Sequence, residues 1–264
     1  MKKPLAKSLN IVDVIVKSRH SNRIKRFIEN QLNNHKDNKM FSFITETWNP
    51  VTGCKHHCIY CWARKLALTK LKGTRKYRNG FKPTIHLEEF KRKFNGGVVF
   101  VSDMGDLFGE FVPSEWIQKV IDYTAKFPNT YFLFMTKNPA RYHEFIDEFP
   151  TNAILGATIE TDRDDLYRKY RISRAPLPSQ RYLAMKELEW DKKFISIEPI
   201  LDFNPEKFPR WIEEISPIMV YVGYDNYSWK LPEPTLHSTM EIIEKLREFT
   251  VVIEKTIRKA WHEK

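Results

Sequence analysis

Seven short apolar segments recur along the 264-residue chain, and stretches with helical patterning separate them. Short strands that alternate with helices pair in parallel through βαβ crossovers. This alternation predicts an α/β fold, and the number of units favours a β/α barrel over a doubly wound sheet. The seven predicted strands cover residues 40–48, 98–102, 129–137, 152–161, 193–201, 218–226 and 250–256.

The predicted architecture is a partial (β/α)6-type TIM barrel over residues 40–264, preceded by a basic helical extension over residues 1–39. In such a barrel, functional residues lie on loops at the carboxyl ends of the strands. Two proline-containing stretches, 174–180 and 230–235, are predicted as loops inside the barrel. Helices are predicted over residues 62–72, 112–127, 138–149, 162–173, 204–215 and 235–249.

The chain is strongly basic, with a formal net charge of +11. Residues 1–40 hold ten Lys or Arg against three acidic residues, and residues 64–82 are basic with no acidic residue. A basic face favours polyanions such as nucleic acid, whereas a lysine-rich surface also occurs without any such partner.

No apolar run is long enough to cross a membrane, and Asp13 interrupts the apolar part of the N-terminus. The sequence therefore predicts a cytoplasmic protein without a signal peptide. In that reducing compartment, free thiols are more often metal ligands or catalytic groups than partners in disulfides.

All three cysteines of the chain lie within eight residues, at Cys54, Cys58 and Cys61. Three soft thiolates on one tight loop can hold zinc or iron. Structural zinc takes four protein ligands, and His56 or His57 could supply the fourth only from inside the loop. Three cysteines with one open position fit a [4Fe–4S] cluster whose fourth iron binds another group.

This CxxxCxxC loop after the first predicted strand resembles the radical S-adenosylmethionine (SAM) superfamily. The segments WNPVTGC, DLFGEFVPSEWI, FLFMTKNPARY and SIEPIL resemble the phage Gp37/Gp68-like subgroup, which is distantly similar to spore photoproduct lyase. The resemblance implies that three thiolates bind three irons and that the fourth iron chelates SAM. It also implies an external electron donor, such as a flavodoxin or ferredoxin, and hydrogen-atom abstraction from a substrate by a 5′-deoxyadenosyl radical.

The same resemblance assigns binding roles to residues near the strand ends. Tyr60 is expected beside the adenine, and Ser102 and Asp103 beside the amino group of SAM. Thr158 and Glu160 share a face at the end of their strand, where Glu160 is suited to the ribose hydroxyls. Thr136 and Lys137 close another strand, where the lysine could bind the SAM carboxylate or a substrate phosphate.

Two further residues are predicted to take part in catalysis. Glu198 lies inside an apolar run, where an unpaired carboxylate is costly to bury. Because the chain has no cysteine outside the loop, a tyrosine such as Tyr224 or Tyr221 is the candidate hydrogen donor.

The predicted function is hydrogen abstraction from nucleic acid or a nucleotide, by a lyase or transferase type of reaction. The two basic segments and the nearby aromatics Trp62, Tyr77 and Phe81, which could stack on bases, favour that substrate class. Two alternatives remain open at this stage. One is the same chemistry on a peptide or small metabolite, and the other is a zinc-holding module that binds nucleic acid without catalysis.

Overall fold

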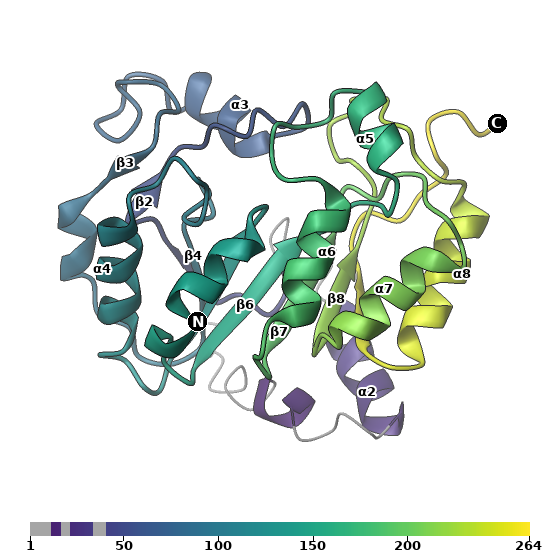
Figure 1. Ribbon diagram of the computed structural model, residues 1–264, viewed down its shortest axis with the longest axis horizontal. Helices are drawn as coiled ribbons and strands as arrows, with labels where there is room; N and C mark the ends of the chain where they lie inside the picture. Colours follow the sequence, from purple (N-terminus) through teal and green to yellow (C-terminus); the bar gives the residue numbers. More distant parts are fainter. Residues whose placement is uncertain (1–11, 17–21, 34–40) are drawn as a thin grey trace, which may run out of the picture.

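A seven-stranded parallel sheet forms the centre of the protein (Figure 1). The computed structural model describes residues 12–16, 22–33 and 41–264. Strand order follows chain order, so each crossover joins neighbouring strands and the α/β prediction is confirmed. The strands are β1 (Glu46–Trp48), β4 (Val98–Val101), β5 (Tyr131–Thr136), β6 (Ala153–Thr158), β7 (Lys193–Ile197), β8 (Met219–Val222) and β9 (Val251–Glu254).

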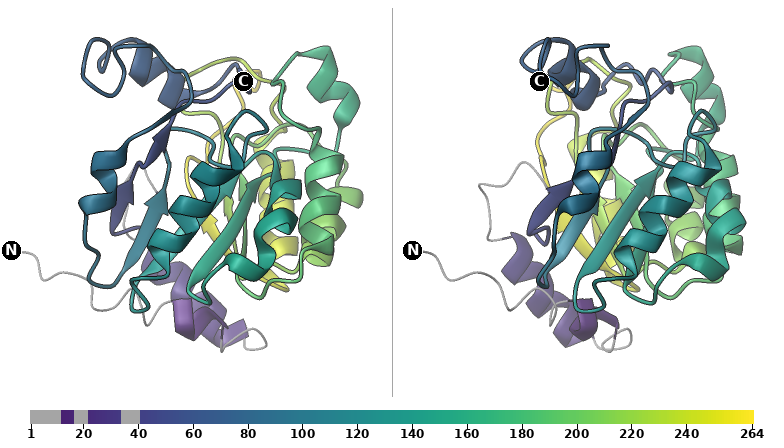
Figure 2. Two further views of the ribbon diagram at one scale, coloured as in Figure 1. Left: turned by 60° about the vertical axis from the view of Figure 1, so that its left-hand side comes forward. Right: turned by 90° about the vertical axis from the view of Figure 1, so that its left-hand side faces the viewer.

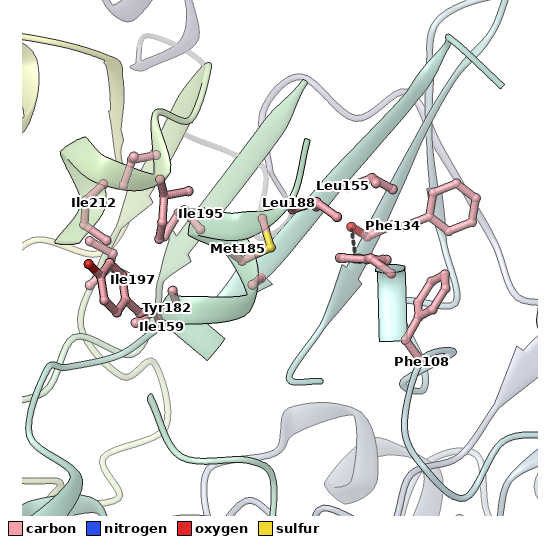
Figure 3. Packing of buried hydrophobic residues seen from close by; sticks show 14 of the residues in the cluster. Phe108, Phe134, Leu155, Ile159, Tyr182, Met185, Leu188, Ile195, Ile197 and Ile212 are labelled. Atoms are coloured by element: carbon pink, nitrogen blue, oxygen red, sulfur yellow. Dashed lines mark hydrogen bonds between the residues drawn. The ribbon is translucent and has the colours of Figure 1, made fainter. Parts of the chain in front are cut away.

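Helices cover the outer face of the sheet and bury one side of every strand. Alternate strand residues such as Ile195 and Ile197 pack against Met185, Leu188 and Ile212 from this helical layer (Figure 3). The layer consists of α4 (Ser114–Thr124), the 3₁₀ helix η2 (Pro139–Glu148), α6 (Pro178–Glu187), α7 (Lys207–Ile215) and α8 (Leu236–Arg247).

The inner face of the sheet is closed at its amino end by the N-terminal part of the chain. Phe41 and Phe43 share a buried cluster with strand residues, and helix α2 (Asn22–Asn33) packs against β9. The Glu29 carboxylate accepts a hydrogen bond of 3.0 Å from the Val252 amide. The predicted helix in this extension is confirmed over α2, whereas residues 1–11, 17–21 and 34–39 lie outside the described residues.

The carboxyl end of the sheet carries the loops and two short helices. In Figures 1 and 2, α3 (Trp62–Leu68) and α5 (Asp164–Lys169) lie at this end, opposite α2. The short strands β2 (Val51–Thr52) and β3 (Thr84–Ile85) pair antiparallel, and the 3₁₀ helix η1 (Leu87–Lys91) follows. Within the described ranges, no helix combines the length and apolar character needed to cross a bilayer.

Three predicted elements differ from the observed ones. The stretch 174–180 is not all loop, because α6 begins at Pro178, and proline is well tolerated in the first turn of a helix. The helix predicted over 138–149 is 3₁₀, and its buried residues Pro139, Tyr142 and Phe145 recur every third residue, which matches three residues per turn. The first strand is restricted to Glu46–Trp48 because the preceding residues form a turn under the inner face.

Candidate active site

The cysteine loop joins β2 to α3 at the carboxyl end of the sheet. Its first residue, Gly53, donates to the Met104 carbonyl at 2.9 Å, which ties the loop to the end of β4. Its last residue, Cys61, caps α3 because its sulfur accepts from the Arg64 amide at 3.3 Å. The helix therefore begins at Trp62, as predicted. All three thiols are free, and Cys58 is the most buried.

His56 fixes one side of the loop through a buried acid. Its Nε2 lies 3.0 Å from Oδ2 of Asp106, and both side chains are almost fully enclosed. Asp106 also accepts from the Thr136 hydroxyl at 2.6 Å and the Lys137 amide at 2.9 Å. Burial raises the pKa of Asp106, but the His56 hydrogen bond and the other donors outweigh it and lower the pKa overall. An ionised carboxylate therefore joins the loop to the ends of β4 and β5.

A second segment fixes the other side of the loop. The Ile59 amide donates to the Ile172 carbonyl at 3.0 Å, and the Arg174 amide donates to the His56 carbonyl at 2.7 Å. Between these two bonds, the Ser173 hydroxyl lies 3.1 Å from the sulfur of Cys58. Backbone pairing thus places a hydroxyl against one of the three sulfurs.

The three thiols are the type of donor that holds iron–sulfur clusters in proteins, although they are not preassembled as a metal site. In the described part of the chain, no group of three or more His, Cys, Asp or Glu side chains is arranged so that it could hold a metal ion. Burial raises the pKa of all three thiols. Coordination to a metal is the condition under which such thiols ionise, and soft thiolates suit iron–sulfur clusters. The chemistry of the residues therefore fits the group.

A buried ionic network lies beside the loop, centred on Glu160. Its carboxylate accepts from Lys137 Nζ at 2.6 Å and Arg181 Nη1 at 2.7 Å, and the Tyr60 hydroxyl donates to it as well. The Lys137 ammonium also lies 5.1 Å from the centroid of the Tyr60 ring. Arg181 Nη1 further donates to the Thr158 carbonyl at 2.9 Å. The structure thus brings together four of the predicted SAM-binding residues.

The other predicted binding residues lie at the ends of β4 and β5. The Ser102 hydroxyl is buried and has no hydrogen-bond partner among the described residues. Asp103 accepts from Asn49 Nδ2 at 2.5 Å, and burial raises its pKa. Thr136 is committed to Asp106. Of these three, Ser102 has an unused hydrogen-bonding group.

The two predicted catalytic residues have different surroundings. Glu198 accepts from Lys255 Nζ at 2.9 Å and from Asn226 Nδ2 at 3.1 Å, so its charge is paired at the carboxyl ends of β7 and β9. The Tyr224 hydroxyl lies 2.7 Å from the Thr239 hydroxyl of α8, in the core between the sheet and the outer helices. In the part of the chain that the structure describes, no contact joins Tyr224 to the cysteine loop.

The hydroxyl of the other candidate tyrosine, Tyr221, is held by Ser42 at 2.9 Å, in the cluster that closes the amino end. Two of the aromatic residues that were predicted to stack on bases are also packed against other parts of the protein. Tyr77 is buried, and Phe81 packs against the small cluster under α3. Trp62 remains exposed.

Four residues of this site were not predicted to act there: Arg181, Ser173, Asp106 and His56 in its role as an anchor. A cavity of about 380 Å³ is lined by His56, Arg181, Asn138 and Arg174, among others. Its volume is within the range of small-molecule pockets. No sequence signal marked Arg181, whose three guanidinium nitrogens all donate to oxygens of the protein.

Replacing Gly53 with alanine is expected to cost clearly more stability than replacing Gly73. Both glycines have φ of +85°, where an alanine costs about 1–2 kcal/mol. A Cβ on Gly53 would lie 2.2 Å from the Lys82 carbonyl oxygen, whereas one on Gly73 meets nothing within 4 Å. Urea unfolding of Gly53→Ala and Gly73→Ala measures the difference, and equal losses would contradict a close backbone approach at Gly53.

Solved structures of spore photoproduct lyase are similar to this chain in fold. A spore photoproduct lyase double mutant with bound AdoMet and dinucleoside spore photoproduct gives a TM-score of 0.51 at 13% sequence identity, covering 77% of this chain and 61% of that one. Spore photoproduct lyase complexed with dinucleoside spore photoproduct gives 0.50 at 14%, covering 75% and 60%. This chain thus spans about three fifths of their length, and at this identity the similarity establishes the partial-barrel fold.

Comparison at the level of sequence gives the family. No curated protein matches the chain. The Gp37/Gp68-like subgroup stays a prediction. A family model described as "Protein of unknown function (DUF5131)" matches residues 38–207, which include the cysteine loop and strands β1 to β7. The chain belongs to the DUF5131 family.

Proposed function

We propose that the chain is a radical SAM enzyme, in which Cys54, Cys58 and Cys61 hold a [4Fe–4S] cluster and SAM binds beside them. The observation that carries this proposal is the position of three free thiols on one loop at the carboxyl ends of a parallel sheet. The fold shared with a lyase solved with bound AdoMet supports it. When bound and reduced by an external donor such as a flavodoxin or ferredoxin, the cluster supplies the electron that cleaves SAM.

The residues of this chain bind and orient SAM in the proposal. The free hydroxyl of Ser102 and the Asp103 carboxylate can accept from the SAM ammonium, and Lys137 can donate to its carboxylate. Glu160 was predicted to contact the ribose, but its carboxylate is fully buried and already accepts from three protein partners. Its role is instead to position Tyr60 and Lys137 beside the cysteine loop.

The proposed substrate is nucleic acid or a nucleotide, in the reducing cytoplasm. The basic segment 64–82 begins two residues after Trp62 and follows the cysteine loop directly, so a polyanion bound there lies near the thiols. Glu198, paired with Lys255 at the carboxyl ends of the strands, is the predicted catalytic residue that the geometry favours. Tyr224 faces α8 and has no part in the proposal.

Anaerobic reconstitution with iron and sulfide tests the proposal. The wild-type chain is expected to develop the broad visible absorption of a [4Fe–4S] cluster and, when reduced, to convert SAM to methionine and 5′-deoxyadenosine. A variant with Cys54→Ala, Cys58→Ala and Cys61→Ala should lose both signals, with circular dichroism confirming that it folds. Bound zinc without cluster absorption or SAM cleavage would support the zinc-holding module instead.

A further inference from the structure

The loop after β8 presents two aromatic side chains at the carboxyl end of the barrel. The buried Asp225 carboxylate accepts from the Tyr227 amide at 3.1 Å and from the Trp229 amide at 2.7 Å. Ser228 and Lys230 have φ of 57° and 51°, a left-handed conformation that costs energy outside glycine. Tyr227 and Trp229 are nevertheless 46% and 43% exposed. A buried acid and a strained backbone thus hold two large rings toward solvent.

This loop meets the helix that follows the cysteine loop. Lys65 Nζ of α3 lies 5.3 Å from the centroid of the Tyr227 ring and 5.9 Å from that of the Trp229 ring. Trp62 is 37% exposed and lies three residues before Lys65, so both side chains share one face of α3. We call Trp62, Lys65, Tyr227 and Trp229 the aromatic rim.

The aromatic rim is also connected to the polar groups inside the barrel mouth. Between the buried Asp225 and the exposed Tyr227, Asn226 donates to the Glu198 carboxylate at 3.1 Å. Glu198 in turn pairs with Lys255. A molecule that stacks on the rim therefore lies next to the proposed catalytic carboxylate at one side and next to the cysteine helix at the other.

The chemistry of the rim suits unpaired bases. Exposed aromatic rings stack on bases of any sequence, and lysines beside them neutralise the phosphates between those bases. The charge around the rim is complementary to such a strand, because the segment 64–82 contains no acidic residue. In a duplex the faces of the bases are stacked on one another and are closed to protein rings, so the rim favours a single strand.

We propose that the aromatic rim binds single-stranded nucleic acid by stacking Trp62, Tyr227 and Trp229 on its bases. Binding of the strand by the rim does not depend on the proposed function. Only the reaction of the bound strand rests on it. This inference assigns strand recognition to Tyr227 and Trp229, which are remote in sequence from the basic segments, and it removes the buried Tyr77 from that role.

Fluorescence anisotropy with labelled oligo-dT and oligo-U, and with a matched duplex, tests the rim on the full reconstituted chain. The double variant Tyr227→Ala, Trp229→Ala is expected to bind single strands at least about tenfold more weakly. Leu183→Ala is the matched control, because Leu183 is 49% exposed on α6 in the outer helical layer and lies outside both basic segments, and it should bind as wild type. Lys65→Gln should reduce the salt slope of binding by about one.

Three outcomes would overturn the inference: wild-type affinity in the double variant, equal affinity for duplex and single strand, or rim-dependent binding of polyglutamate without binding of either oligonucleotide. SAM cleavage by the wild-type chain is scored separately. If cleavage is absent but single strands bind through the rim, the radical SAM proposal fails and the rim stands. If cleavage occurs but the double variant binds strands normally, the rim fails and the radical SAM proposal stands.

Discussion

Replacing Glu160 with glutamine is expected to lower the free energy of unfolding by about 3–5 kcal/mol. Glu160 is fully buried between Lys137 Nζ at 2.6 Å and Arg181 Nη1 at 2.7 Å. Arg181 is itself completely enclosed, so a neutral glutamine leaves a buried guanidinium charge without its counter-ion. Urea unfolding followed by circular dichroism measures the loss.

An exposed ion pair provides the matched control. Arg163 and Asp202 pair with side chains that are 41% and 42% exposed, so solvent screens their attraction. Asp202→Asn is therefore expected to cost less than about 1 kcal/mol. If Glu160→Gln and Asp202→Asn lowered the free energy of unfolding by similar amounts, burial would not make the Glu160 ion pairs more stabilising than the exposed pair.

The same network predicts how stability depends on pH. Burial raises the pKa of Glu160, but Arg181 and Lys137 outweigh it and lower the pKa from 4.5 to about 2. A depressed folded-state pKa gives stability that is complete above pH 4.5 and is lost as the pH falls toward 2. The corresponding contribution is about 3 kcal/mol. The difference in stability between wild type and Glu160→Gln should therefore shrink over this window, and a constant difference would contradict the assignment.

The strands could be predicted because their sequence signal is local. Segments such as Phe132–Phe134 and Ile195–Ile197 are buried on both faces, and parallel strands of this kind appear as short apolar runs. The missed helix α6 has no such signal. Its buried residues include Arg181 and Tyr182, and two prolines at its start, Pro176 before the helix and Pro178 as its first residue, are typical of a loop. The helix is stabilised by tertiary contacts that bury polar residues, and such contacts cannot be read from the local sequence.

The site was predictable only in part, for a related reason. The cysteine spacing is local, whereas His56 and Asp106 are 50 residues apart and meet only because β4 ends beside the loop. Strand alternation placed Thr158 and Glu160 together but could not show that Arg181 reaches both. The same rule does not extend to Tyr224, since it lies beyond the end of β8 and its side chain turns toward α8.

Replacing Asp106 with alanine is expected to cost about 3 kcal/mol or more and to reduce the amount of the proposed cluster that forms on reconstitution. The carboxylate accepts from His56, the Thr136 hydroxyl, and the Lys137 and Phe108 amides, so alanine leaves four buried donors unsatisfied. Each such group costs about 1–3 kcal/mol, although a water can satisfy some of them. Losing the His56 contact also frees the cysteine loop from the ends of β4 and β5.

Asp103→Ala is the matched control for this second effect. Asp103 lies three residues earlier on the same loop, and the side-chain donor to its carboxylate is Asn49 rather than a residue of the cysteine loop. Urea unfolding gives the stability of each variant, and iron and sulfide analysis after reconstitution gives its cluster content. If Asp106 anchors the loop, Asp106→Ala loses both stability and iron, whereas Asp103→Ala retains its iron. An Asp106→Ala protein that is destabilised yet holds as much iron as wild type would show that the carboxylate stabilises the barrel without positioning the thiols.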